Sequence, residues 1–152
     1  DLMEDRKRLF GALFHFTRKL PVSYICAKVK KSECEDVVEL TTKLTKSISK
    51  VLRDHAEYFE SFDKIIVYYD NGQVELTKIL TTLFNALLYN VEFRKVKPSD
   101  YKLFQVADLV CTLELLIEKA STSSFTSSES EFFHSERDFR REYYKYISQK
   151  HI

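Results

Sequence analysis

The sequence predicts an α/β fold in which a mixed or mostly parallel β-sheet is flanked by helices. Three short segments, 22–31, 64–69 and 91–97, are rich in β-branched and aromatic residues, as strands are. Each is followed by a longer segment in which apolar residues recur every three or four positions, as on one face of a helix. Because a chain that passes from strand to helix to strand usually returns in the same direction, this order favours parallel pairing.

The first two predicted helices have recognisable ends. Residues 4–19 place their apolar side chains at helical spacing, and Pro21 closes the segment. Residues 32–59 form a long amphipathic pattern. Ser32 is its expected N-cap, and Glu35, three residues later, completes a capping box.

The second predicted strand leads directly into a polar turn. Segment 64–69, KIIVYY, is apolar almost without interruption, which is typical of a central strand covered on both faces. Asp70 follows it, and Asn71-Gly72 is compatible with a hairpin. The helix-spaced apolar stripe over 76–88 instead indicates a turn from strand to helix.

The remaining segments complete the predicted architecture. Residues 91–97 alternate imperfectly and are expected to form an edge strand. The helix predicted over 101–119 is apolar nearly all round. The serine-rich segment 121–131 is expected to be a linker, and 132–152 a C-terminal docking helix. The predicted α/β domain therefore spans residues 1–120.

Composition limits the class of protein. With 152 residues and 44% hydrophobic content the chain can form one domain with a core. Lys and Arg number 24 against 23 Asp and Glu, so no global charge indicates a nucleic-acid or membrane partner. The longest charge-free apolar stretch, 79–91, is shorter than the roughly 20 residues that a membrane-spanning helix needs. The three cysteines are odd in number and lack CxxC spacing, which favours a reducing, cytoplasmic location.

Two aspartates are the candidate catalytic and metal-binding residues. Asp70 ends a predicted strand, at the edge where ligands gather in parallel sheets. Asp108 shares one strip of its helix with Gln105 and Thr112 among apolar side chains, so largely dry surroundings are expected. If the two carboxylates face each other, they repel unless a cation lies between them. Carboxylate oxygens suit a hard divalent ion, Mg²⁺ or Mn²⁺.

Two segments together resemble a known family. VYYDNGQ, 67–73, and KPSDYKLFQVADLV, 97–110, look like the two downstream motifs of the domain-of-unknown-function 3800 family, an RNase H-like family widespread in bacteria. The resemblance covers roughly residues 20–119. The family's Asp-Glu-Ser-Gly motif on its first strand is absent here. Because the chain also starts without Met, we expect a fragment that lacks one or more N-terminal strands.

The resemblance implies an RNase H-like fold and two-metal phosphodiester hydrolysis, in which Asp70 and Asp108 are the metal ligands. Without the upstream aspartate the site would be incomplete. Three amides would orient the ligands, and a local basic segment would hold a phosphate backbone. The amides are Asn71, Gln73 and Gln105, and the basic residues are Arg94, Lys95 and Lys97.

Each candidate also has an ordinary structural interpretation. The turn at 70–72 suits simple turn chemistry. Asp108 would then be a buried carboxylate paired with a Lys or Arg, and Gln105 a partner of the backbone. The basic segment 94–102 would be a solvated edge whose lysines discourage further pairing.

Two functional hypotheses follow. The first is a metal-dependent nuclease or related phosphoryl-transfer hydrolase that acts on nucleic acid or nucleotides. The second is a non-catalytic protein-interaction or nucleic-acid-binding module on the same scaffold, in which the acids are structural and the C-terminal helix docks a partner. No membrane partner is expected, and the sequence leaves the oligomeric state open. Because a fold does not determine a function, the site must decide between them.

Overall fold

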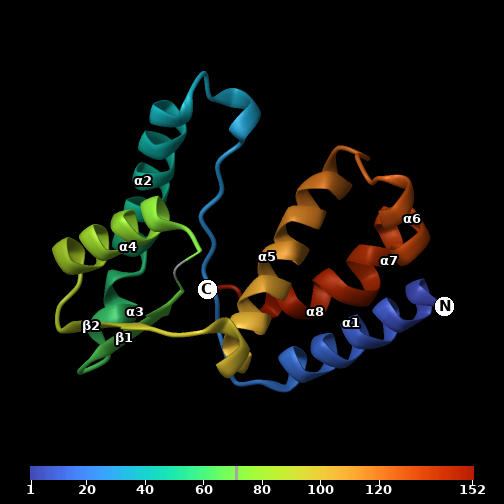
Figure 1. The fold of residues 1–152 in the computed structure, drawn as a ribbon, viewed down its shortest axis with the longest axis horizontal. Coiled ribbons are helices and arrows are strands. Elements are labelled where there is room, and N and C mark those ends of the chain that lie inside the picture. The colour runs from blue at the N-terminus through green and yellow to red at the C-terminus, as the bar shows by residue number, and fades with distance from the viewer. Residues whose placement is uncertain (71) are drawn as a thin grey trace. The chain divides into compact units, whose positions relative to one another are not determined.

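The computed structural model describes residues 1–70 and 72–152 and divides the chain into two compact units (Figure 1). The helical unit consists of Asp1–Tyr24 together with Tyr101–Ile152. The α/β unit consists of Ile25–Asp100. Among the described residues, no helix combines the length and the hydrophobicity that a membrane crossing requires.

A β-α-β element forms the centre of the α/β unit. It consists of strand β1 (Ile65–Tyr69), helix α4 (Val74–Leu87) and strand β2 (Val91–Lys95). The strands pair in parallel, from Ile65 opposite Val91 to Tyr69 opposite Lys95. The prediction of a mixed α/β structure with parallel pairing is confirmed, and the turn after β1 leads into a helix. Because the sheet of the described residues has two strands, the RNase H-like fold itself stays a prediction.

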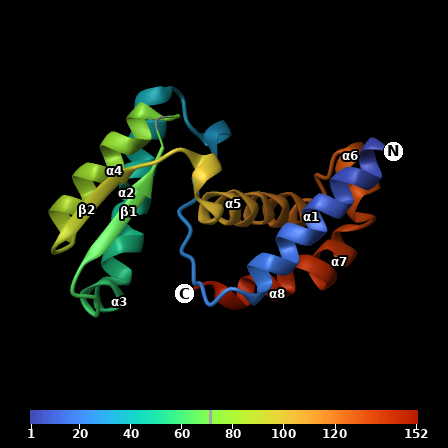
Figure 2. The same cartoon turned by 60° about the horizontal axis from the view of Figure 1, so that its bottom comes forward.

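The helix expected over 32–59 begins later and is interrupted. The segment contains η1 (Lys31–Glu33), α2 (Val37–Asp54) and α3 (Ala56–Glu60), and η2 (Pro98–Asp100) ends the unit. The N-cap of α2 is Asp36, whose side chain accepts a hydrogen bond from the Glu39 N–H at 2.8 Å. Ser32 lies in η1, so the expected cap is wrong. Helix α2 packs against α4 (Figures 1 and 2).

The sheet packs mainly on one face. Alternate side chains of β1 are partly buried, and Ile66 and Tyr68 between them are exposed. On the packed face, Phe93 of β2 lies edge-on to Phe84 of α4, with ring centroids 6.3 Å apart. The expectation that both faces of segment 64–69 are covered is therefore wrong. A continuous apolar run does not reveal how many layers cover the strand.

The strand expected at 22–31 does not form. Tyr24 makes a single parallel bridge to the C-terminal end of the chain. Its N–H donates to the Lys150 carbonyl at 2.9 Å, and its own carbonyl accepts from the Ile152 N–H at 3.0 Å. Residues 25–30 form no ladder with any described residue. An alternating pattern yields a strand only where another strand offers a long edge, and here the pairing is limited to one bridge, between Tyr24 and His151.

The helical unit is built around one long helix. It contains α1 (Leu2–Lys19), α5 (Lys102–Ser121), α6 (Ser127–Phe133), α7 (Glu136–Phe139), the π-helical turn η3 (Arg140–Tyr144), α8 (Lys145–Ile147) and η4 (Ser148–Lys150). Helix α1 and the C-terminal segment both contact α5 (Figure 2). The helices predicted over 4–19 and 101–119 are confirmed.

Aromatic side chains from the C-terminal segment fill the core of the helical unit. Leu113 of α5, Phe139 and Ile147 are fully buried. Phe139 lies edge-on to Phe133, with ring centroids 5.2 Å apart, and Phe133 lies edge-on to Tyr143 at 5.4 Å. Such pairs add about 0.5–1.5 kcal/mol each beyond the burial of their area. The segment predicted as a docking helix therefore docks within its own unit.

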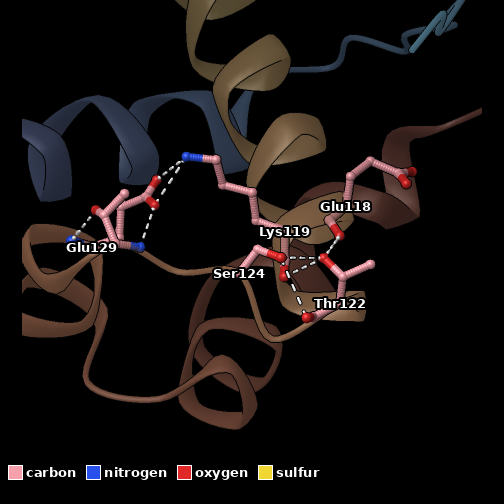
Figure 3. A network of polar contacts seen from close by, with 6 residues as sticks. Glu118, Lys119, Thr122, Ser124 and Glu129 are labelled. Carbon is pink, nitrogen blue, oxygen red and sulfur yellow. Dashed lines mark hydrogen bonds and ion pairs between the residues drawn. The ribbon is translucent and has the colours of Figure 1, made fainter. Parts of the chain in front are cut away.

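The serine-rich segment 121–131 contains the end of α5 and the start of α6 instead of an unpacked linker. Thr126 and Glu129 form a capping box, in which each side chain accepts from the other residue's N–H, at 3.1 and 2.9 Å. Lys119 of α5 donates to both oxygens of Glu129 at 3.0 Å (Figure 3). Serine and threonine serve helix caps as well as linkers, so composition alone does not separate the two.

The substitution Leu113→Ala should lower the free energy of unfolding by about 2–5 kcal/mol, because it opens a cavity in the core. Leu115→Ala is the matched control, since Leu115 lies on the same helix and is 59% exposed. Its effect should stay within about 0.5 kcal/mol. Urea denaturation followed by circular dichroism measures both values. Equal losses would contradict the assignment of the core face of α5.

Candidate functional site

The carboxyl ends of the two parallel strands meet at one edge of the α/β unit, and an open pocket of about 530 Å³ lies there. We call it the edge pocket. The Val96 N–H donates to the Tyr69 carbonyl at 2.9 Å and extends the pairing just beyond β2. The edge pocket is lined by Asp70, Gly72, Lys95, Val96, Lys97 and Pro98.

Asp70 is held by a turn at this edge. Its Oδ1 accepts a hydrogen bond from the Gly72 N–H at 2.8 Å, which is the contact of an Asx turn. A Cβ at position 72 would lie 3.2 Å from this oxygen, so the turn suits glycine. Oδ2 makes no hydrogen bond to any described residue. The turn therefore fixes a half-buried carboxylate and leaves one of its oxygens available to a ligand.

The lysines of the edge pocket add positive charge beside Asp70. Lys95 ends β2, and Lys97 follows it on the same side of the pleat. Both are exposed, and neither forms an ion pair with a described residue. The structure thus brings together three of the residues that the sequence proposed, namely Asp70, Lys95 and Lys97.

Arg94 does not line the edge pocket. Its Nε donates to Glu92 at 2.9 Å, and its Nη1 donates to the Tyr68 hydroxyl at 3.3 Å. Lys64 forms a second ion pair with Glu92 at 2.5 Å. Because residues alternate along a strand, Arg94 lies on the opposite face of the sheet from Lys95. Hydrogen bonds from Arg94, and next from Lys64, lower the pKa of Glu92 to about 2.

Of the predicted amides, Gln73 belongs to the α/β unit and Gln105 to the helical unit. Gln73 is exposed at the N-cap of α4, and its carbonyl accepts from the Thr77 N–H at 3.0 Å and from the Thr77 hydroxyl at 2.9 Å. Asn71 lies outside the described residues. Gln105 is exposed on α5 in the helical unit.

Asp108 is also exposed on α5, so the expectation of dry surroundings is wrong within its own unit. The buried face of α5 instead passes through Leu109 and Leu113. Leu103 and Leu115 are themselves 56% and 59% exposed, so an apolar neighbour in sequence does not mean a buried position. Asp70 and Asp108 belong to different units, and neither unit contains the pair.

The edge pocket alone offers a divalent ion few ligands. Asp70 is the one carboxylate among its lining residues, and two ammonium groups lie beside it. The described residues contain no group of three or more His, Cys, Asp or Glu arranged to hold a metal. By themselves, the lining residues fit an anion better than a cation.

Sequence reasoning missed one buried acid. Glu114 on α5 is 4% exposed, and it accepts hydrogen bonds from the hydroxyls of Tyr24 at 2.5 Å and Tyr144 at 3.3 Å. These bonds satisfy a carboxylate that would otherwise be costly to bury. Its position in the apolar run TLELLI, four residues after Val110 and three before Ile117, was the available signal.

The Glu92 carboxyl carbon should titrate in NMR spectra with a midpoint near pH 2. Its pKa is lowered by folding, so the stabilisation is complete above the ordinary value of 4.5 and is lost as the pH falls through about 2. Replacing either cation, in Arg94→Met or Lys64→Met, should raise the midpoint. Lys46→Met removes an equal charge elsewhere and should leave it unchanged. An unchanged midpoint in both cation variants would contradict the assigned cause.

The chain was compared with models of protein families, with curated proteins and with solved structures, and none of the three comparisons found a match.

Proposed function

We propose that the α/β unit binds the phosphate groups of a nucleic acid or nucleotide in the edge pocket, and that the protein is a metal-dependent phosphodiester hydrolase. The observation that carries this proposal is the convergence of Asp70, Lys95 and Lys97 at the carboxyl edge of parallel strands. Ligands of open α/β sheets gather at this edge. The resemblance of the two segments around Asp70 and Asp108 to an RNase H-like family supports the same interpretation.

Phosphate recognition follows from the charges of the edge pocket. Lys95 and Lys97 are exposed ammonium groups without ion-pair partners among the described residues. Helix α4 begins at Val74, and the side chain of its N-cap, Gln73, makes no capping hydrogen bond. The first N–H groups of α4 therefore remain available to an anion, and the helix dipole favours negative charge there.

Catalysis needs a divalent ion, and the edge pocket contributes one carboxylate, Asp70, to bind it. A bound Mg²⁺ or Mn²⁺ ion would align a water molecule and stabilise the leaving oxygen. Asp70 would contribute its available Oδ2. Asp108 is a candidate ligand through the sequence resemblance alone. Lys95 and Lys97 would hold the flanking phosphates in position.

A non-catalytic nucleic-acid-binding module is the second candidate. It is favoured by the single carboxylate of the edge pocket and by the exposure of Asp108. In this case the lysines bind the backbone, and Asp70 only closes the turn before α4. The two candidates share the phosphate-binding step and differ in their need for a divalent ion.

A cytoplasmic setting fits either candidate. Cys26, Cys34 and Cys111 form no disulfide among the described residues. Free thiols persist in the reducing environment of the cytoplasm.

Lys95→Gln and Lys97→Gln should each weaken binding of a fluorescein-labelled single-stranded 12-mer. Each lysine that contacts a phosphate should also reduce the slope of log K against log salt by about 0.7. Fluorescence anisotropy at several salt concentrations measures both effects. Lys46→Gln makes the same charge change on α2, outside the edge pocket, and should leave the slope unchanged. If all three variants behave alike, the phosphate assignment fails.

Asp70→Asn and Asp108→Asn separate the enzyme from the binding module. In the first variant, the amide oxygen of the introduced asparagine can still accept from the Gly72 N–H, so the turn should survive while the charge is lost. For the enzyme, both substitutions should weaken Mn²⁺ binding at least about tenfold in EPR titrations and abolish cleavage of the 12-mer.

Asp63→Asn, an exposed position of the same unit, is the control and should change neither property. Oligonucleotide binding that persists in EDTA, without Mn²⁺ binding or cleavage by the chain extended to include the expected upstream strand, would reject the enzyme and support the module.

A further inference from the structure

A second pocket, of about 320 Å³, lies wholly within the helical unit and plays no part in the function proposed above. It is formed by α1, α5 and α6, and the start of α1 lies beside α6 in both views (Figures 1 and 2). We call it the α1–α6 pocket. Its lining residues are Met3, Arg6, Phe10, Thr112, Leu116, Ser128, Glu129, Phe132 and Phe133.

The walls of the α1–α6 pocket are mainly apolar and aromatic. Phe10 lies edge-on to Phe132 and Phe133, with ring centroids 5.3 and 5.6 Å apart, and Leu116 of α5 lines the pocket with them. Phe133 and Leu116 are 6% and 4% exposed, so they belong to the packed core. The volume lies at the lower end of the range of about 300–1,000 Å³ that is usual for small-molecule sites. A pocket of this volume suits a ligand whose apolar part is one aromatic ring with a short aliphatic chain.

The charged groups of the pocket favour an anionic head group. Glu129 is already neutralised, because Lys119 donates to both of its oxygens at 3.0 Å and the Thr126 N–H donates at 2.9 Å (Figure 3). Arg6 forms no hydrogen bond or ion pair with any described residue. Lys7 adds a second positive charge nearby, with its Nζ 5.9 Å from the centre of the Phe132 ring. The guanidinium of Arg6 is therefore available to a carboxylate, which it can bind through two parallel hydrogen bonds.

We propose that the α1–α6 pocket binds a small carboxylate with an apolar body. The body contacts Phe10, Leu116 and Phe132, and the carboxylate pairs with Arg6 at the rim. Ser128 also lines the pocket, and its hydroxyl can donate to the same oxygens.

The single methionine of the chain provides a direct measurement, because Met3 lines this pocket. In the full chain labelled with [methyl-¹³C]methionine, titration with 3-phenylpropionate should shift the one methyl signal, with a dissociation constant in the millimolar range or tighter. The matched neutral probe, 3-phenylpropan-1-ol, should bind about three- to fivefold more weakly, because it lacks the charge that Arg6 recognises.

Arg6→Gln should reduce the affinity for 3-phenylpropionate to that for the alcohol and leave the affinity for the alcohol unchanged. Arg8→Gln removes the same charge from α1 at a residue that pairs with Asp5 outside the pocket, and it should alter neither affinity. The proposal is overturned if the methyl signal does not move. It is equally overturned if the acid and the alcohol bind alike, or if Arg8→Gln weakens the acid as much as Arg6→Gln does.

Discussion

The parallel pairing of β1 with β2 determines what the α/β unit presents to a ligand. Two strands that run in the same direction must end at the same edge, and α4 is the connection that makes this direction possible. Asp70 and Lys97, which are distant in sequence, therefore line one pocket. An antiparallel pairing of the same strands would place these residues at opposite edges. The chemistry of the edge pocket depends on this pairing more than on any single side chain.

The helical unit depends on a different constraint, which is the satisfaction of buried polar groups around α5. Glu114 lies in the core, and tyrosine hydroxyls from both ends of the unit donate to it. Its carboxylate thereby links the segment after α1, through Tyr24, to η3, through Tyr144. Aromatic edge contacts then fill the space around this link. The two units thus present different environments, an exposed basic edge in one and an apolar pocket with an arginine at its rim in the other.

Local patterns in the sequence predicted much of the fold, and long-range features limited the prediction of the site. Helical spacing correctly indicated α1, α4 and α5, because the period of apolar residues is a local property. The prediction of a strand at 22–31 was wrong because a strand requires a pairing partner, which its own sequence does not specify. The prediction that Asp108 lies in dry surroundings was wrong because α5 exposes some of its leucines as well. Hydrophobicity alone therefore did not indicate which side of α5 is buried. Lys95 and Arg94 are adjacent in β2 and therefore lie on opposite faces of the sheet. Their separation was predictable from the sequence.

The division of the chain has a consequence for assembly. The helical unit is discontinuous: Tyr24 and Tyr101 belong to it, and everything between them is an insertion. Its contacts between α1 and α5 close a large loop, whose entropic cost grows only with the logarithm of the loop length. Folding of the β-α-β element, whose contacts are nearer in sequence, shortens the flexible part of that loop. A change in the number of surface residues in the α/β unit should therefore alter the closure cost of the helical unit only slightly.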